Sequence, residues 1–492
     1  MKKIFKFYNS YSKLPKGFYE KTIPEPVKNP TLIYINEGLL DFLNLDAKFM
    51  KTIEAQSVFS GNLIPIGAEP IALAYAGHQF GHFVPVLGDG RAILLGEIFA
   101  SDKTKKDVQL KGSGQTVFSR NGDGRAPLGA ILREYLISEA LHFLDIPSTR
   151  VLAVVNSGEY INREVLTNSG ILTRISSGHV RVGTFEYFAY RNDYKSVKIL
   201  TDYVIKRNFP DIKNSKKKYT KFLHRVMTLQ AKLVAKWTNN GFIHGVMNTD
   251  NVSICGETID YGPCAFMDHY NPQQVFSYID VHGRYSYENQ SKITLWNLSK
   301  LGESMIKIID DNEKKSLSQI INVLEEYSEK FNAYLLHGLK NKMGFNITKE
   351  GDKQLFNDFL LVLYKENIDY TQAFRYLSSI LKDLNNEKKF LLLFRNKRTA
   401  KNWLDKWKNR ILCEKSSPLK ISSQMQLCNP CYIPRNHIVD KAIKLVELKN
   451  DYSLFDQVLT LIKKPFQEKE NGTFLFMPPS KKEKIKNTFC GT

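Results

Sequence analysis

The sequence predicts an α+β protein in which strands and helices occupy separate parts of the chain, as two lobes. Residues 60–190 are rich in glycine and in short strand-forming runs bounded by turns. From about residue 195 onward, apolar residues recur at the three- and four-residue spacing of helices. Because strands and helices do not alternate along the chain, this order favours an α+β division over a doubly wound parallel sheet.

The strand-rich part contains four clear runs and one helix. The runs are "RAILLGEIFA" (91–100), "DVQLKG" (107–112), "RVLAVV" (150–155) and "EYINREVL" (159–166). The helix is predicted over 126–146, with Pro127 near its start and Pro147 just beyond its end.

Helices dominate the remainder of the chain. They are predicted over 219–242, 315–340, 353–364, 369–384 and 399–410, and the polar residues 460–492 are interpreted as an extended tail. A chain of 492 residues exceeds what one hydrophobic core usually supports. We therefore expect a strand-rich lobe at 1–190, a second lobe at 191–340, and a helical C-terminal extension with the tail at 341–492.

Composition excludes several classes of protein. The hydrophobic fraction of 42% and aromatic fraction of 12% argue against disorder. The net charge of +20 comes from scattered lysines without a recognisable nucleic-acid-binding motif, so specific nucleic-acid binding is not expected. There is no apolar run of about 18 residues and no signal peptide, and six sparse cysteines suit a reducing compartment. We expect a cytoplasmic monomer that does not bind membranes.

The segment "HGVMNTDN", His244 to Asn251, resembles the catalytic loop of protein kinases with one key difference. In kinases an aspartate two residues after the histidine accepts the proton of the attacking hydroxyl, and the asparagine binds metal. Here that position is Val246, which cannot accept a proton. The loop is therefore a chance match, an inactive kinase loop, or a site for another reaction with another base. Asp250 is the only carboxylate in the loop and the available general base.

A second short motif strengthens the first. Asp260, nine residues after Asn251, begins "Asp-Tyr-Gly" where kinases carry Asp-Phe-Gly. An amide and a carboxylate on either side of a turn would suit Mg²⁺. A strand-ending Lys111 and Glu134 on the following helix match the kinase lysine–glutamate pair that positions phosphates.

Three glycine- or arginine-containing stretches suit phosphate binding. Gly88, Gly90 and Arg91 could bring backbone and a forked cation close to phosphate, although a plain turn between strands accounts for them equally well. The loop "GSGQTVFSRNGDG" (112–124) supplies flexible backbone that could wrap a nucleotide. Arg174 and Arg181 flank a loop and could converge on one anion, although taken alone they read as surface arginines.

Two rival metal sites are weaker. His78 and His82 have the i, i+4 spacing of helical metal ligands but lack a third ligand nearby. Cys428 and Cys431, with Cys413 and His437, could form a zinc tetrad, but the spacing is irregular. Packed or free side chains are the better interpretation of both groups.

Six long blocks together resemble the SelO (YdiU) family over nearly the whole chain. They are "YAGHQFGHFVPVLGDGRAILLGE", "QLKGSGQTVFSRNGDGRAPLGAILREYLISEAL", "RISSGHVRVGTFEYF", "HGVMNTDNVSICGETIDYGPCAFMD", "HGRYSYENQ" and "NPCYIPRNH". The resemblance implies a kinase-like two-lobe (pseudokinase) fold that binds ATP in a flipped orientation. It implies transfer of AMP to Ser, Thr or Tyr hydroxyls of protein substrates, with Mg²⁺ or Mn²⁺.

The same resemblance implies a role for each matching residue. Asp250 would be the proton acceptor, Asn251 and Asp260 would bind the metal, and Glu134 would orient Lys111. Nucleotide contacts would come from Gly88, Gly90, Arg91, Lys111, Asp123, Gly124, Arg174, Arg181 and Asp260. Cys490, third from the end, stands where some members carry a redox-active residue, but the chain lacks the paired C-x-x-C pattern. The remaining alternatives are a γ-phosphate kinase using Asp250 and a non-catalytic ATP-binding scaffold.

Overall fold

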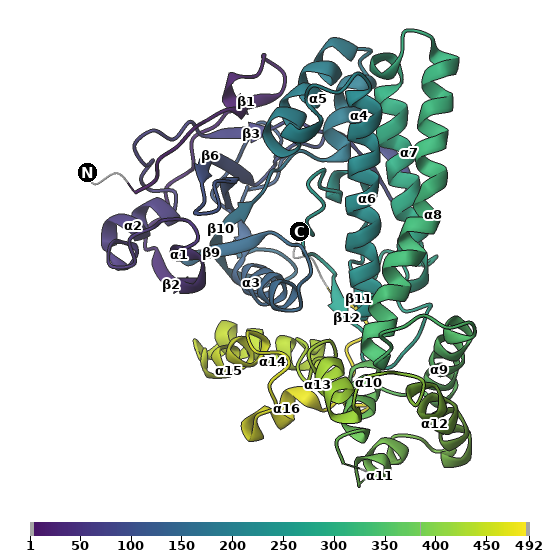
Figure 1. Ribbon diagram of the computed structural model, residues 1–492. Coiled ribbons are helices and arrows are strands. Elements are labelled where there is room, and N and C mark those ends of the chain that lie inside the picture. Colours follow the sequence, from purple (N-terminus) through teal and green to yellow (C-terminus); the bar gives the residue numbers. More distant parts are fainter. Residues whose placement is uncertain (1–3, 384, 489–492) are drawn as a thin grey trace.

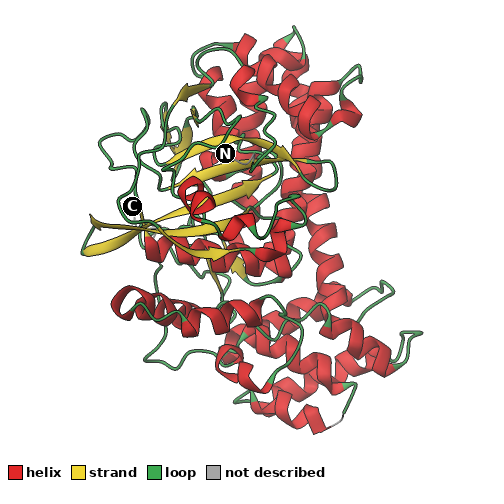
Figure 2. Cartoon of the chain, turned by 90° about the vertical axis from the view of Figure 1, so that its left-hand side faces the viewer, coloured by secondary structure: helices red, strands yellow, loops and turns green. Residues whose placement is uncertain are grey.

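The computed structural model describes residues 4–383 and 385–488 of an α+β protein (Figures 1 and 2). Its main sheet has eight strands, all paired antiparallel, in the order β1-β3-β6-β7-β10-β9-β2 with β8 beside β10. The strands are β1 (Tyr19–Lys21), β2 (Thr31–Ile35), β3 (Ile71–Leu73), β6 (Ala92–Phe99), β7 (Lys105–Lys111), β8 (Ala126–Pro127), β9 (Arg150–Asn162) and β10 (Leu166–Ser176). Two small hairpins, β4 (Gly77–Gln79) with β5 (His82–Val84) and β11 (Phe242–Ile243) with β12 (Ala265–Phe266), lie outside it.

The sheet confirms most predicted strands and corrects one. The runs at 91–100 and 107–112 form β6 and β7, and the run at 150–155 begins β9. The prediction of one strand over 159–166 was wrong, because β9 ends at Asn162 and β10 starts at Leu166. The polar "NRE" stretch (162–164) allows the chain to reverse there, with the Arg163 amide donating to the Val165 carbonyl at 3.2 Å.

The helix α3 (Leu128–Phe143) lies between the sheet and the C-terminal helices (Figure 1). Its side chains are buried on nearly every face, which is typical of a helix enclosed by other elements. One hydrophobic cluster joins it to β9, to the end of α6 (Lys218–Asn239), and to α14 (Asn436–Lys449) and α15 (Ser453–Ile462). On the opposite face of the sheet, α1 (Glu37–Leu40) and α2 (Ile53–Phe59) cover a separate cluster. The helix α3, which carries Glu134, therefore packs on the sheet with one side and on α14 and α15 with the other.

The helices confirm the predicted segments within a few residues and add others. The predicted helix at 219–242 ends earlier, as α6, because Gly241 adopts a positive φ of 68° and Phe242 begins β11. The others are α4 (Val182–Ala189), α5 (Tyr194–Asn208), α7 (Gln290–Ile309), α8 (Glu313–Met343), α9 (Asp352–Glu366), α10 (Tyr370–Ile380), α11 (Asn385–Leu392), α12 (Lys397–Ile411), α13 (Pro418–Gln426) and α16 (Thr473–Phe476). None of the helices in the described part of the chain is long and apolar enough to cross a membrane.

The long helix α8 connects two hydrophobic cores. Its first half contributes Ile320, Val323 and Tyr327 to a core shared with α5, α6 and α7. Its last turns contribute Leu339 and Met343 to a core shared with α9, α10, α12 and α13. Figure 1 shows α8 alongside α6 and continuing down to the C-terminal helices.

The interpretation of 460–492 as an extended tail was wrong for part of its described residues. The segment finishes α15, forms α16, and then returns to the body, where buried Thr488 donates its hydroxyl to the Pro263 carbonyl at 2.6 Å. The polar composition of the segment does not indicate this order, because the residues that hold it lie in distant parts of the chain.

The main anchor of the C-terminal segment is Arg435, whose side chain is completely buried. Its guanidinium pairs with Asp268 at 2.6 Å and with Asp369 at 2.8 Å. It also donates to the carbonyls of Leu475, at 3.1 Å, and Phe476, at 2.9 Å. One side chain thus ties together the segment after β12, the start of α10, the start of α14 and α16.

Lys342, near the end of α8, predicts a pH-dependent stability. Its side chain is 4% exposed, its Nζ lies 4.5 Å from the centre of the Phe374 ring, and burial lowers its pKa to about 7. An unfolded lysine titrates at about 10.4, so between these values the unfolded chain binds more protons and stability increases with pH. We expect Lys342→Met to raise the free energy of unfolding at about pH 6 by roughly 1–3 kcal/mol.

Urea unfolding of both proteins across the pH range would measure this effect. The advantage of Lys342→Met should shrink by about 1.4 kcal/mol for each pH unit above 7, as the wild-type lysine becomes neutral. Lys444→Met serves as the control, because the Lys444 side chain is 63% exposed. A difference that stayed constant with pH would show that the lysine is not desolvated in the folded protein.

Candidate active site

A buried ion-pair cluster lies where β7, α3 and β10 meet. Lys111 ends β7 and its Nζ contacts the Glu134 carboxylate of α3 at 2.6 Å. The other oxygen of Glu134 accepts from Arg174 of β10, also at 2.6 Å. Lys111 and Arg174 reach the same carboxylate because β7 and β10 are neighbouring strands. The predicted lysine–glutamate pair is thus formed and is extended by an arginine.

Asp260 brings a second part of the chain into this cluster. Its carboxylate contacts Arg181 at 2.6 Å and Arg174 at 3.1 Å, with Lys111 at 3.9 Å. Burial alone would raise the pKa of Asp260, but these three cations outweigh it and hold the pKa well below its usual range. Asp260 is therefore ionised, and three cations converge on one small region.

The loop carrying Asp250 packs beside Asp260. His244 is held by its Nε2, 2.9 Å from the Ile259 carbonyl, and the Asn251 amide donates to the Val246 carbonyl at 3.1 Å. The Asp250 backbone carbonyl accepts from Arg181 at 2.7 Å. This places Asp250 next to the cation that also contacts Asp260.

The Asp250 side chain is unusual for a buried carboxylate. It is 7% exposed, and its Oδ1 atom has no hydrogen-bond partner among the described residues. Burial raises the pKa of the Asp250 carboxyl to about 7, although Arg181 opposes the shift. A buried polar atom without a partner calls for an explanation, and a catalytic role is one such explanation.

Asp89, between Gly88 and Gly90, belongs to the cluster and was not identified from the sequence. It is buried, accepts hydrogen bonds from the Leu73 amide and the Gln109 side chain at 3.2 Å each, and lies 3.6 Å from Arg181. The available signal was a carboxylate between two glycines, directly before a strand.

The two glycines themselves pack against the protein. A Cβ at Gly88 would lie 2.2 Å from the Phe118 ring, and one at Gly90 would lie 2.8 Å from the Phe118 carbonyl. Both positions therefore allow the loop at 112–124 to approach the turn closely.

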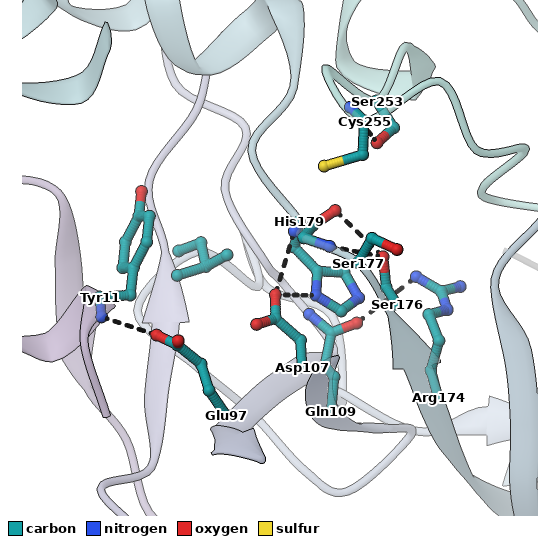
Figure 3. Close-up of polar contacts among 12 residues, drawn as sticks. Tyr11, Glu97, Asp107, Gln109, Arg174, Ser176, Ser177, His179, Ser253 and Cys255 are labelled. Atoms are coloured by element: carbon teal, nitrogen blue, oxygen red, sulfur yellow. Dashed lines mark hydrogen bonds and ion pairs between the residues drawn. The ribbon is translucent and has the colours of Figure 1, made fainter. Parts of the chain in front are cut away.

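One face of β7 carries three polar side chains that connect the cluster to its surroundings. Asp107, Gln109 and Lys111 share that face because side chains alternate along a strand. Gln109 accepts from Arg174 at 3.4 Å, and Asp107 binds the Nδ1 of buried His179 at 2.8 Å, as Figure 3 shows. His179 stands two residues before Arg181, so Asp107 anchors the segment that delivers Arg181. Neither Asp107 nor His179 was identified from the sequence.

Three further predicted nucleotide contacts, Arg91, Asp123 and Gly124, lie in or beside the loop at 112–124. Asp123 pairs with Arg163 at 2.8 Å on the surface. Gly124, with φ of 65°, packs against the backbone of Gly114, and the Arg91 carbonyl accepts from the Gly112 amide at 2.7 Å. These residues shape the loop at 112–124. Cys490 lies outside the described residues.

The side chains of the two rival metal sites are not arranged as ligand sets. His78 and His82 are not on a helix, because they belong to the β4–β5 hairpin, where His82 pairs with Gln79. The His78 Nδ1 contacts Glu186 at 2.6 Å. Cys413, Cys428 and Cys431 are free thiols, and the described residues contain no group of three or more His, Cys, Asp or Glu placed to hold a metal.

The donor set around Asn251 and Asp260 nevertheless fits a hard divalent cation. The Asn251 nitrogen is committed to the Val246 carbonyl, which leaves its amide oxygen as a ligand, and Asp260 is ionised. Two oxygen donors, completed by phosphate oxygens and water, suit Mg²⁺ or Mn²⁺.

Comparisons with known proteins show what the chain is similar to. A family model described as "Protein adenylyltransferase SelO" matches residues 3–463. Relatives named protein nucleotidyltransferase YdiU from Rhizobium etli and Rhodopseudomonas palustris are 45% and 44% identical over 488 residues. These matches cover 99% of this chain and 97% and 99% of the relatives.

A third relative of that name, from Rhizobium meliloti, is 43% identical over 488 residues and is covered to 99%. Site and comparisons together define an enzyme of the nucleotidyltransferase class. The chain belongs to the SelO family.

Proposed function

We propose that this enzyme transfers AMP from ATP to the hydroxyl groups of Ser, Thr or Tyr in protein substrates. The observation that carries the proposal is Asp250, a buried carboxylate beside Arg181 and Asp260 with one oxygen that has no hydrogen-bond partner in the part of the chain that the structure describes. The position four residues earlier, where a kinase has its base, is the aliphatic Val246. A base displaced along the loop suits a substrate whose reacting phosphorus is also displaced.

The proposed fold is kinase-like, with ATP bound in the flipped orientation. The contact between strand-ending Lys111 and helical Glu134 supports this, as do Asn251 and Asp260 in their motif positions. We assign the nucleotide-binding lobe to 1–190, the lobe with the catalytic loop to 191–340 and the extension to 341–492.

The proposed reaction is a single displacement at the α-phosphorus of ATP. Asp250 accepts the proton of the acceptor hydroxyl, the oxygen forms a bond to the α-phosphorus, and the bond to the β-phosphate oxygen breaks to release pyrophosphate. Lys111, Arg174 and Arg181 neutralise the phosphate charge, and Glu134 holds Lys111 in place. A divalent cation held by Asn251 and Asp260 would add positive charge on the phosphate oxygens.

Further nucleotide contacts are assigned to Gly88, Gly90, Arg91, Asp123 and Gly124. The buried Asp89 carboxylate, 3.6 Å from Arg181, links the turn at 88–90 to the phosphate-binding arginine. The loop at 112–124 packs on that turn through Phe118, which supports assigning both segments to one nucleotide site.

The position of the label in ATP tests this function directly. We expect protein acceptors to become labelled from ATP carrying the label at the α-phosphate and to stay unlabelled with the γ-phosphate label. Intact mass would show the gain of AMP. Label from the γ position alone would establish a kinase, and label from neither, with ATP still bound, would indicate a non-catalytic scaffold.

A further inference from the structure

The β4–β5 hairpin is fastened to the loop that carries Asp250. The His78 amide donates to the Thr249 hydroxyl at 2.7 Å, and the Phe80 amide donates to the Asn248 side chain at 3.0 Å. Asn248 is fixed in turn by the Tyr285 hydroxyl at 2.7 Å. The backbone of the hairpin is therefore hydrogen-bonded to the side chains of the two residues that directly precede Asp250.

The two faces of β4 have different neighbours. His78 points toward Glu186, at 2.6 Å, and its ring packs against Trp296 with centroids 5.2 Å apart. Gly77 and Gln79 lie on the opposite face, because side chains alternate along a strand. That face is directed at Asp250. Burial raises the pKa of the Asp250 carboxyl, and the Gln79 side chain is among the groups that oppose this shift.

Gly77 leaves the space that the Asp250 carboxyl occupies. A Cβ built on Gly77 would lie 2.3 Å from Asp250 Oδ1 and 2.9 Å from both its Cβ and Cγ. The φ of Gly77 is not positive, so the backbone would accept alanine without strain. The need for glycine is therefore steric and comes from Asp250 itself.

We propose that Gly77 and Gln79 are positioning residues for the transfer step. Gly77, which has no side chain, leaves room for the Asp250 carboxyl, and the Gln79 amide lies on the same face of β4. The inference rests on the proposed role of Asp250 as the proton acceptor. It adds the β4–β5 hairpin, which lies outside the main sheet, to the elements that surround Asp250. Lys111 and Arg174, the cations proposed to bind phosphate, come from other elements, β7 and β10.

Gly77→Ala tests the steric part of the proposal. The added methyl group should displace the Asp250 carboxyl, and a misplacement of about 1 Å costs on the order of 10²-fold in rate. We expect kcat for AMP transfer to fall by about that factor while KM for ATP stays within about twofold. Gly38→Ala is the matched control, because a Cβ there meets only the Asn36 side chain at 3.5 Å.

Gln79→Leu tests the amide and covers the case in which Gly77→Ala fails to fold. It keeps a side chain of similar size, removes the amide from the face of β4 directed at Asp250, and should lower kcat by about tenfold with KM for ATP unchanged. Thermal melting of each variant reports its folding.

Asp250→Asn, measured in parallel, separates the two proposals. If Asp250→Asn keeps full activity, the proposed base is wrong. If Asp250→Asn is inactive while folded Gly77→Ala or Gln79→Leu keeps the wild-type kcat, the positioning role is overturned. A fall in kcat equalled by a rise in KM for ATP would also contradict it, because it would indicate a disturbed nucleotide site.

Discussion

Asp250→Asn is expected to lower kcat for AMP transfer by about 10²–10⁴-fold and to leave KM for ATP nearly unchanged. Asparagine has the shape of aspartate but cannot accept the proton of the hydroxyl. The phosphate contacts proposed for Lys111, Arg174 and Arg181 do not require the Asp250 carboxyl, since Arg181 reaches the Asp250 backbone carbonyl. Incorporation of α-labelled ATP into a protein acceptor, over a range of ATP concentrations, would measure both constants.

Two results define how this experiment is interpreted. Asp145→Asn is the control, because the Asp145 side chain is 95% exposed, and it should retain full activity. Wild-type kcat in Asp250→Asn would mean that the proton leaves by another route. A loss that came entirely from a higher KM for ATP would assign Asp250 to nucleotide binding.

Arg435→Met is expected to destabilise the protein by about 3–5 kcal/mol. The substitution leaves the carboxylates of Asp268 and Asp369 buried without their shared cation, and it removes the donors to the carbonyls of α16. Methionine fills much of the volume, so the loss reflects charge and hydrogen bonding more than a cavity. Urea unfolding at constant pH would measure it.

The matched control is Lys444→Met on the same helix, α14. Lys444 forms an exposed pair with Asp440 at 2.8 Å, and such pairs contribute little. Arg435→Lys should recover only part of the loss, since one ammonium cannot reproduce the forked contacts of a guanidinium. An Arg435→Met protein as stable as wild type would show that water or rearrangement satisfies both carboxylates.

The core of the candidate site could be predicted because its residues lie in short motifs. Asn251 and Asp260 lie nine residues apart on either side of a turn, and Lys111 and Glu134 lie on consecutive elements. Their positions along the chain therefore already suggest their roles. The contact of Lys111 with Glu134 follows that expectation, whereas the contact of Asp260 with Arg181 was not predicted. The roles themselves remain predictions.

The supporting residues could not be predicted because their partners are far along the chain. Asp89 faces Arg181, and Asp107 faces His179 and Arg207, across distances in sequence that no local pattern records. Gly77 reads as an ordinary loop glycine until the Asp250 carboxyl is seen against it. The role of each depends on what approaches it in three dimensions.

The fold shows the same contrast. Helices with long apolar stripes, such as α6 and α8, were predicted within a few residues of their observed bounds. The turn within 159–166 was missed because strand-forming residues flank it on both sides, tyrosine and isoleucine before it and valine and leucine after it. The polar segment after 460 was misjudged because its order depends on Arg435 and on the carbonyl of Pro263.

The return of the chain end to Pro263 has a consequence for synthesis. Thr488 and Pro263 are separated by 225 positions, and Pro263 stands three residues after Asp260. A nascent chain on the ribosome has made every residue of the ion-pair cluster long before Thr488 emerges. This contact can therefore form only after 225 further residues have been made, and a product that ended between Pro263 and Thr488 would contain the ion-pair cluster without this contact.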